Sequence, residues 1–266
     1  MRIWMVGLLV LLAGFRMQAQ GDEHIYRIAP GEAWAAPLVG VFAGASWYLQ
    51  SKVEPFTLPE LAALDRGKIP SFDRWNAGTW RPKVSRASDV VVGVTCLSPF
   101  ALFASQRPRT EAGRIVLMGA EAGLFSMGLV NTAKGLAQRT RPFAYGTAAP
   151  IDELTSPHAR LSFFSGHTCF AATASFFAAR VFADMHPDSK ARSWVWASAA
   201  AIPAGVATMR ILAGKHFLSD VLIGYAVGAA VGILVPTLHR TKAAKRISMG
   251  PLYLPGGGGF QAEMRF

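Results

Sequence analysis

The 266-residue sequence has few charged residues: Asp, Glu, Lys and Arg together make up only 16% of it. A soluble domain usually carries about 25%. Hydrophobic residues reach 52%, and an apolar surface of this extent needs a solvent other than water. The shortage of charge therefore argues against an ordinary soluble domain and predicts a membrane protein.

Cysteines and metal-binding patterns are also scarce. The two cysteines, Cys96 and Cys169, both lie inside apolar stretches. There a free cysteine acts as a small buried hydrophobe rather than as half of a disulfide or a metal pair. No metal-ligand spacing occurs, which argues against a zinc hydrolase, so the sequence predicts no metal and no cofactor. No Pro/Ser-rich linker divides the chain, and we expect one domain.

Negative charge is the scarcer sign. There are 16 Asp and Glu against 27 Lys and Arg, a formal net charge of +11. A basic protein could bind nucleic acid, but here the cations stand in short clusters beside apolar runs, and no RNA-binding aromatic signature is present. This arrangement is more typical of membrane flanks and of a phosphate site. We therefore predict no nucleic-acid partner.

Long apolar stretches recur along the chain. A span of about 20 residues crosses the hydrocarbon core, and six stretches approach or reach this length: 35–50, 88–105, 115–132, 166–183, 194–212 and 218–238. The predicted fold class is all-α, a polytopic membrane helix bundle with five or six spanning helices. The first stretch is short and contains Pro37, so it could instead be an interfacial or re-entrant helix. Ser88 and Asp89 are predicted to cap the second helix. Gly224, Gly228 and Gly232 indicate close helix packing in the last.

We divide the chain into four segments. Residues 1–19 resemble an export signal, with a positive start, an apolar run and a cleavage position, although a membrane anchor is the competing interpretation. Residues 20–87 hold the short first helix and a polar connector. Residues 88–240 form the main helix bundle, and 241–266 are predicted to be a flexible, glycine-rich tail.

The distribution of cations predicts sidedness. Placing the end of 115–132 outside leaves three basic groups inside, as the positive-inside rule requires: Arg107, Arg109 and Arg114; Lys190 and Arg192; Arg240, Lys242, Lys245 and Arg246. Either the N-terminus is exported and 35–50 does not cross, or the N-terminus is cytoplasmic and 35–50 crosses as the first of six. Both arrangements predict a bacterial-type inner membrane protein with its polar clusters on the extracytoplasmic side.

Arg210, His216 and Asp220 form one of three polar clusters at the ends of apolar stretches. His216 and Asp220 are four residues apart, so on a helix they share a face. Asp220 can then accept a hydrogen bond from one ring nitrogen of His216. This fixes the tautomer and leaves the other nitrogen free to act as a nucleophile. A His–Asp pair that merely caps a helix is the alternative.

The other two clusters are suited to binding an anion. Ser165 as N-cap of the 166–183 helix, with Gly166 allowing close backbone approach, could cradle phosphate oxygens, and His167 could act as general acid. Lys134 and Arg141 could clamp a phosphoryl group. Taken alone, the tripeptide is a weak signal, and the Lys–Arg pair is more typical of anchoring at the membrane surface. Arg139 could be a second clamp or such an anchor.

Together the clusters resemble a known signature. Lys134-x6-Arg141-Pro142, Ser165-Gly166-His167 and Arg210-x5-His216-x3-Asp220 are similar to the three motifs of the type 2 phosphatidic acid phosphatase and vanadium haloperoxidase superfamily, in its membrane lipid-phosphatase branch. The resemblance covers about 134–220. Two departures are visible: Phe164 stands where proline is usual, and Met209 where serine is usual. They bear on phosphate geometry and substrate choice rather than on the type of reaction.

The resemblance implies metal-independent hydrolysis of a phosphate monoester or pyrophosphate on a membrane lipid. His216 would form a phosphohistidine, Asp220 would orient it, and His167 would protonate the leaving group. The implied phosphate-binding residues are Lys134, Arg141, Ser165, Gly166 and Arg210. The implied partners are a lipid phosphate and the bilayer. The alternatives are a vanadate-dependent haloperoxidase, against which the bilayer-length helices argue, and a non-catalytic lipid-phosphate-binding membrane protein, against which the intact histidines argue.

Overall fold

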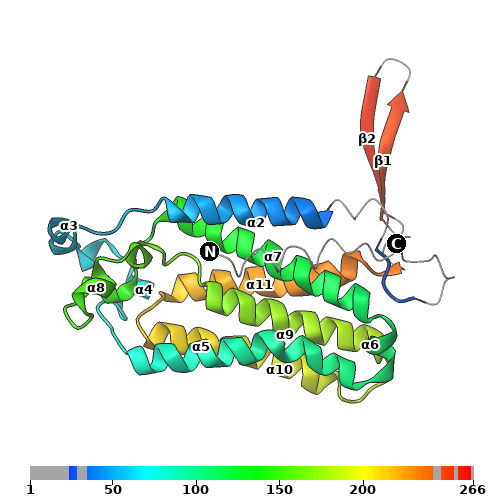
Figure 1. Cartoon of the computed structure of the whole chain (residues 1–266), viewed down its shortest axis with the longest axis horizontal. Helices are drawn as coiled ribbons and strands as arrows, with labels where there is room; N and C mark the ends of the chain where they lie inside the picture. The colour runs from blue at the N-terminus through cyan, green and yellow to red at the C-terminus, as the bar shows by residue number, and fades with distance from the viewer. Residues whose placement is uncertain (1–23, 29–34, 242–246, 255–256, 265–266) are drawn as a thin grey trace, which may run out of the picture.

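The computed structural model describes residues 24–28, 35–241, 247–254 and 257–264. Its long helices run side by side, as Figure 1 shows. They are α2 (Ala35–Ser51), α5 (Pro82–Leu97), α7 (Ala112–Ala137), α9 (Gly166–Met185), α10 (Arg192–Leu212) and α11 (Leu218–Leu238). Each apolar stretch of the sequence forms one of these helices, and the all-α bundle is confirmed.

The outer helices have the length and surface of membrane spans. Among the described residues, four segments are long and apolar enough to cross a bilayer: Pro82–Ala104, Ala112–Tyr145, Arg192–Leu212 and Leu218–Leu238. α9 is less apolar because it packs against α5, α7, α10 and α11, so that its Thr168, Thr173 and Ser175 are buried against protein. The chain is therefore a multi-pass membrane protein, consistent with the predicted five or six spans.

The second helix starts earlier than its predicted cap. It begins at Pro82, where a missing N–H leaves no helix hydrogen bond unmade, and Arg81 is the N-cap residue. The predicted cap at Ser88 and Asp89 is wrong, since both lie inside α5 and Ser88 is buried. These polar residues mark an inward-facing surface of the helix, not its boundary.

Three glycines along α11 let it pack closely against α9. A Cβ added at Gly224 would stand 2.6 Å from the carbonyl oxygen of Ser165, and one at Gly228 would stand 2.2 Å from that of Cys169. Gly232 faces α9 in the same way. No side chain fits at these positions unless a helix moves. The packing role predicted for this spacing is confirmed, and it sets how α9 sits against α11.

Short elements gather at the two ends of the bundle. Figure 1 shows α3, α4 and α8 together at one end, which we call the cap end. Its elements are α3 (Leu58–Ala62), η3 (Arg66–Lys68), α4 (Ser71–Arg74), η5 (Pro142–Tyr145), α8 (Ile151–Leu154) and η6 (Pro157–Arg160). At the opposite end, the far end, η4 (Ser98–Ala104) and α6 (Gln106–Thr110) connect α5 to α7.

Residues 24–28 are fixed to the far end. The backbone N–H groups of Ile25 and Tyr26 donate to the Glu111 carboxylate at 2.6 and 3.1 Å, and the Tyr26 hydroxyl donates to Asp184 at 3.1 Å. The chain then reaches the cap end along α2, which packs against α7. Because α2 has 17 residues and is not among the four candidate spans of the described residues, both arrangements considered for 35–50 stay predictions.

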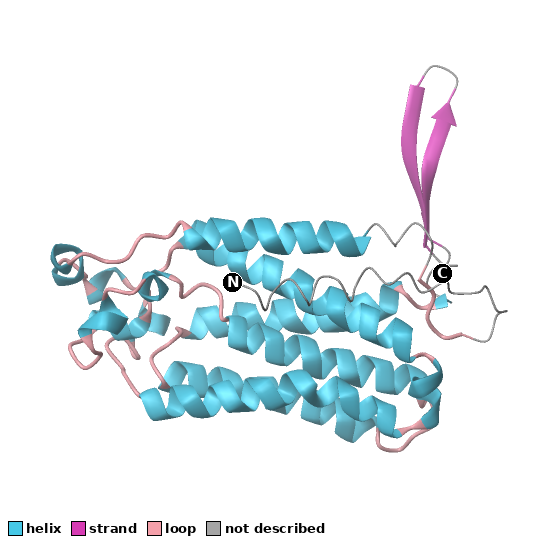
Figure 2. Cartoon of the chain, viewed as in Figure 1, coloured by secondary structure: helices cyan, strands magenta, loops and turns pink. Residues whose placement is uncertain are grey.

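The chain continues beyond the bundle as a hairpin. β1 (Ile247–Leu254) and β2 (Gly257–Met264) pair antiparallel, with Ile247 opposite Met264, and Figure 2 shows them as the strand pair that follows the helices. The segment for which the sequence predicts a flexible tail thus contains paired strands. The predicted export signal at 1–19 lies outside the described residues.

Candidate active site

Three chain reversals at the cap end bring the predicted clusters together. α7 ends where Gln138 adopts a left-handed conformation (φ 40°) and its N–H donates to the Lys134 carbonyl oxygen. α9 begins with Ser165 as its N-cap. α10 leads into α11 through Gly214 (φ 74°), where a Cβ would stand 1.8 Å from the Thr79 carbonyl oxygen. Only glycine permits this last turn, and it holds the third cluster beside the other two.

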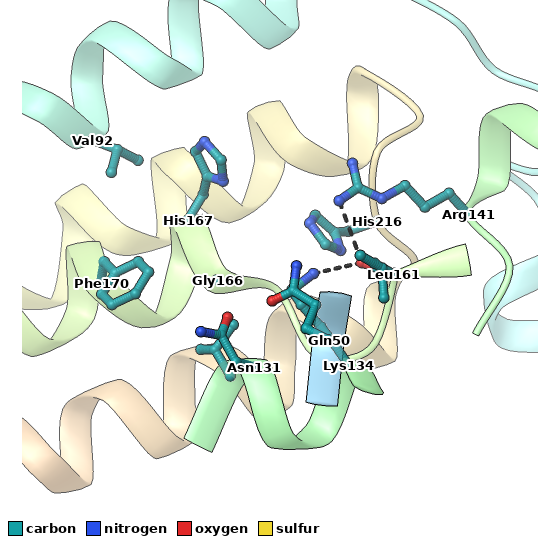
Figure 3. A pocket seen from close by; sticks show the side chains of 11 residues that line it. Gln50, Val92, Asn131, Lys134, Arg141, Leu161, Gly166, His167, Phe170 and His216 are labelled. Carbon is teal, nitrogen blue, oxygen red and sulfur yellow. Dashed lines mark hydrogen bonds between the residues drawn. The ribbon is translucent and has the colours of Figure 1, made fainter. Parts of the chain in front are cut away.

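A cavity of about 220 Å³ lies where the clusters meet. Figure 3 shows Lys134, Arg141, His167 and His216 around it. The apolar part of its wall includes Val92, Val130 and Phe170. Among the described residues no carboxylate lines it. The cavity therefore has a cationic side and a hydrophobic side.

The two cations of the wall turn toward the same backbone oxygen. Lys134 Nζ donates to the Leu161 carbonyl at 2.5 Å, and Arg141 Nη2 donates to it at 3.3 Å. Within the described part of the chain, neither forms an ion pair with a carboxylate. Two neighbouring positive charges repel each other unless an anion lies between them. Over the same residues, no group of three His, Cys, Asp or Glu side chains is placed to hold a metal ion.

His216 is held with one ring nitrogen free. The residue is only 1% exposed, and its Nδ1 lies 2.8 Å from the Ser162 carbonyl oxygen and 3.7 Å from Oδ2 of Asp220. Because a carbonyl only accepts, we assign the hydrogen to Nδ1, which leaves the lone pair on Nε2. We predicted that Asp220 would accept this hydrogen bond. In the structure Ser162 accepts it, and the carboxylate lies just beyond.

The surroundings keep His216 uncharged. Burial lowers its pKa well below the ordinary value for histidine, and the nearby positive charges of Lys134, Arg141 and Arg210 lower it further. The imidazole is therefore neutral at neutral pH, the form in which it can attack an electrophile.

Asp220 anchors the segment that holds His216. Its Oδ2 accepts hydrogen bonds from the Ser162 hydroxyl at 2.6 Å and from the Phe217 N–H at 2.9 Å. The second bond caps the start of α11, so the alternative role as a capping residue is also present. Asp220 thus fixes both the carbonyl that binds His216 and the helix turn that carries it.

Arg139 has neither of the two roles considered for it. Its Nη1 donates to Asp220 Oδ1 at 2.5 Å, and its Nη2 donates to Asp73 Oδ2 at 2.7 Å. Asp73, from α4, also accepts from the Ser219 N–H at 3.0 Å. Arg139 therefore bridges two buried carboxylates, those of Asp73 and Asp220. The sequence offers no signal for Asp73, because its partners are distant along the chain.

His167 and Arg210 meet at Asp89. His167 Nε2 lies 2.9 Å from Asp89 Oδ1, and Arg210 Nη1 lies 3.0 Å from the same oxygen. Arg210 Nη1 also donates to the hydroxyls of Ser85 and Ser88, at 3.3 and 3.0 Å. Arg210, which was predicted to bind phosphate, therefore contacts α5. Asp89, which was wrongly predicted to cap that helix, contacts the cavity residue His167.

Ser165 acts as the predicted N-cap, since its Oγ accepts from the Thr168 N–H at 3.3 Å. It is fully buried, and its own N–H donates to the Asp220 carbonyl oxygen at 3.0 Å. The cavity wall contains Lys134, Arg141, Gly166, His167 and His216. Ser165, Arg210 and Asp220 lie one layer behind it.

Residues 115–244 match the family model of the PAP2 superfamily, a range that contains all three clusters. Among solved structures the chain is similar to the first transmembrane PAP2 type phosphatidylglycerolphosphate phosphatase from Bacillus subtilis. That similarity has 20% identity and a TM-score of 0.36 over 76% of this chain and 94% of that chain. No curated protein sequence matches the chain.

Proposed function

We propose that the chain, whose residues 115–244 match the PAP2 superfamily model, is a membrane phosphatase that hydrolyses a lipid phosphate through a phosphohistidine intermediate. The family match supports the coarser part, a lipid-phosphatase type of function. The finer part rests on one observation: two imidazoles and two cations without carboxylate partners line one cavity, Lys134, Arg141, His167 and His216.

The proposed reaction has two steps, formation of the phosphohistidine and its hydrolysis, and these groups act in both. Nε2 of His216 attacks phosphorus, so that a P–N bond forms while the P–O bond to the lipid breaks, and His167 gives a proton to the departing oxygen. Lys134 and Arg141 bind the phosphoryl oxygens and stabilise the charge that develops on them. Water then attacks phosphorus, so that a P–O bond forms while the P–N bond to His216 breaks; His167 takes the proton of the water, and inorganic phosphate leaves.

The hydrophobic side of the cavity supports a lipid substrate. Val92 comes from α5, Val130 from α7 and Phe170 from α9. A phosphate ester with an alkyl chain would place its headgroup against the cations and the start of its chain against these side chains. The substrate would approach laterally from the bilayer, as a monoester or a pyrophosphate.

We further propose that the cap end faces the extracytoplasmic side of a bacterial-type inner membrane. Arg107 in α6 and Arg192 at the start of α10 lie toward the far end, as the positive-inside rule requires for a cytoplasmic face. In a cysteine-free background, Lys52→Cys should react with an impermeant maleimide on spheroplasts, and Arg27→Cys only after permeabilisation; both positions are exposed. The reverse labelling would place the active site in the cytoplasm.

His216→Ala tests the nucleophile. Because the second imidazole of the cavity, His167, is assigned to proton transfer and not to attack on phosphorus, we expect phosphate release from lipid phosphates to fall by more than about 10³-fold. The wild type should keep its activity in EDTA, since the cations that bind phosphate are its own side chains. Phosphate release by purified protein in detergent measures both effects, over phosphatidic acid, phosphatidylglycerol phosphate, undecaprenyl pyrophosphate and lipid A phosphates.

His158→Ala is the matched control. His158 is an exposed histidine of η6, also at the cap end, and it does not line the cavity. Turnover should survive in this variant. Equal turnover by the His216 variant would remove the nucleophile assignment. Binding of phosphate without release by the wild type would support the non-catalytic alternative, and vanadate-dependent oxidation of bromide by peroxide would support the haloperoxidase.

A further inference from the structure

We propose that Asp89 is a positioning residue for the general acid: its carboxylate fixes the tautomer of His167 and ties it to Arg210, so that Nδ1 of His167 serves the leaving oxygen. The inference rests on the proposed function and adds to it a residue that lies outside the three sequence clusters. It depends on three features of α5, His167 and Arg210.

The first feature is the face that α5 presents to the site. Ser88 and Asp89 follow Ser85 by three and four residues, so both lie on the same side of the helix as Ser85. All three contact the same nitrogen, Nη1 of Arg210, at 3.3, 3.0 and 3.0 Å. Val92, one turn further along, lines the cavity. One turn of α5 therefore binds Arg210 through Ser85, Ser88 and Asp89. The next turn contributes Val92 to the cavity wall.

The second feature is which nitrogen of His167 is occupied. Its Nε2 lies 2.9 Å from the Asp89 carboxylate. A carboxylate only accepts, so Nε2 carries a hydrogen in both the neutral and the protonated ring. The nitrogen left for proton exchange is Nδ1. After Nδ1 gives its proton to the leaving oxygen, the ring remains in a defined Nε2–H tautomer, with a lone pair on Nδ1 ready for the hydrolytic water.

The third feature is the contrast between the two histidine–carboxylate pairs. Asp220 is fully buried, capped into α11, and touches the ring of His216 only at 3.7 Å. Asp89 has a half-exposed side chain and contacts the ring of His167 directly. A carboxylate this close to a phosphate site would repel the substrate if it were uncompensated. Arg210 neutralises the Asp89 carboxylate. Asp89 can therefore orient His167 without placing an unpaired negative charge beside the phosphate.

The test compares leaving groups. A primary alkyl phosphate needs its departing alkoxide protonated, whereas p-nitrophenolate leaves without a proton. For Asp89→Asn, kcat for dodecyl phosphate should fall by about 10²-fold, at the low end of general-acid effects, while kcat for p-nitrophenyl phosphate changes only a few-fold. Retained p-nitrophenyl phosphate turnover also shows that the variant folds.

Ser88→Ala is the matched control, because Ser88 contacts Arg210 but not His167. It should lower turnover of the two substrates by the same factor. If Asp89→Asn also affects both substrates equally, Asp89 acts only through Arg210 or through folding, and the proposal is overturned.

A second measurement does not depend on turnover. In full-length protein labelled with ¹⁵N-histidine, with His167→Ala for assignment, the neutral ring of His167 should be the Nε2–H tautomer. Asp89→Ala should lose that preference, and an unchanged tautomer would overturn the inference. If the wild type hydrolyses neither phosphate, the proposed function fails, and the spectra still decide whether Asp89 positions His167.

Discussion

The two ends of the bundle differ in how their charges are paired. At the far end, Asp184 accepts a hydrogen bond from the Tyr26 hydroxyl and pairs with Arg180 and Arg240 at 3.2 and 3.1 Å. Every partner there contributes to holding the chain together: one arginine lies on α9, the other follows α11, and the tyrosine precedes α2. The buried negative charge of Asp184 is thus matched by two arginines.

At the cap end, the cavity cations are not matched. Lys134 and Arg141 meet over a backbone carbonyl instead of a carboxylate, and the buried carboxylates Asp73 and Asp220 pair with Arg139. Positive charge that the protein leaves uncompensated is available to a phosphoryl group. A functional site commonly gives up stability in this way. Substitutions should therefore have opposite consequences at the two ends.

Lys134→Met should separate activity from stability most clearly. Removing a cation that stabilises developing charge lowers kcat/KM by about 10²–10³-fold. The thermal unfolding temperature in detergent should stay the same or rise, because a buried charge without an ionic partner is replaced by a side chain of similar length. A large loss of stability would mean that Lys134 holds the fold together.

The same variant should change the pH profile. Burial and then the neighbouring cations lower the pKa of His216, so the wild type keeps its neutral nucleophile to a lower pH than an ordinary histidine would. Its activity is lost as the pH falls through that lowered pKa. Without Lys134 the pKa rises, and the acid limb of kcat/KM, measured between about pH 4 and 8, should move to higher pH.

Alanine substitutions at Gly224 and Gly232, both on α11, allow a direct comparison of the two ends. A Cβ at Gly224 would stand 2.6 Å from the Ser165 carbonyl oxygen, and one at Gly232 would stand 2.6 Å from that of Thr173. Either alanine substitution should lower the free energy of unfolding by about 1–3 kcal/mol through overpacking. Only Gly224→Ala should also lower kcat of the folded fraction, because it pushes on the start of α9, next to His167. Equal kcat in both variants would contradict this.

Asp184→Asn should have the smallest effect of these variants. In contrast to Lys134→Met, it should lower stability and leave activity unchanged. The amide keeps an oxygen for Tyr26 but loses the charge that faces Arg180 and Arg240, which should cost about 1–2 kcal/mol of stability. Phosphate release per folded molecule should match that of the wild type, since the site lies at the other end. Thermal unfolding and an activity assay on the same sample provide the comparison.

Much of the fold and part of the site could be predicted from local patterns. The apolar runs specify the six helices, the Gly224–Gly232 spacing indicates a packing face, and Ser165 is recognisable as an N-cap from its position before a helix. The motif residues Lys134, Arg141, His167 and His216 were predicted as one site and do line one cavity. These features depend on residues close to one another in the chain, or on a combination of motifs already known to occur together.

The sequence alone determined a polytopic helix bundle with three cationic clusters at helix ends, because hydrophobic runs and helix termini are properties of short segments. Only the tertiary structure decided the partners of the clusters. Asp89 was wrongly predicted to cap a helix and contacts His167 instead. Arg139 forms an ion pair with Asp220. The Ser162 carbonyl, rather than Asp220, accepts the hydrogen bond of His216. Each of these contacts joins residues tens of positions apart, and their distances depend on how α5, α9 and α11 pack, which no local pattern encodes.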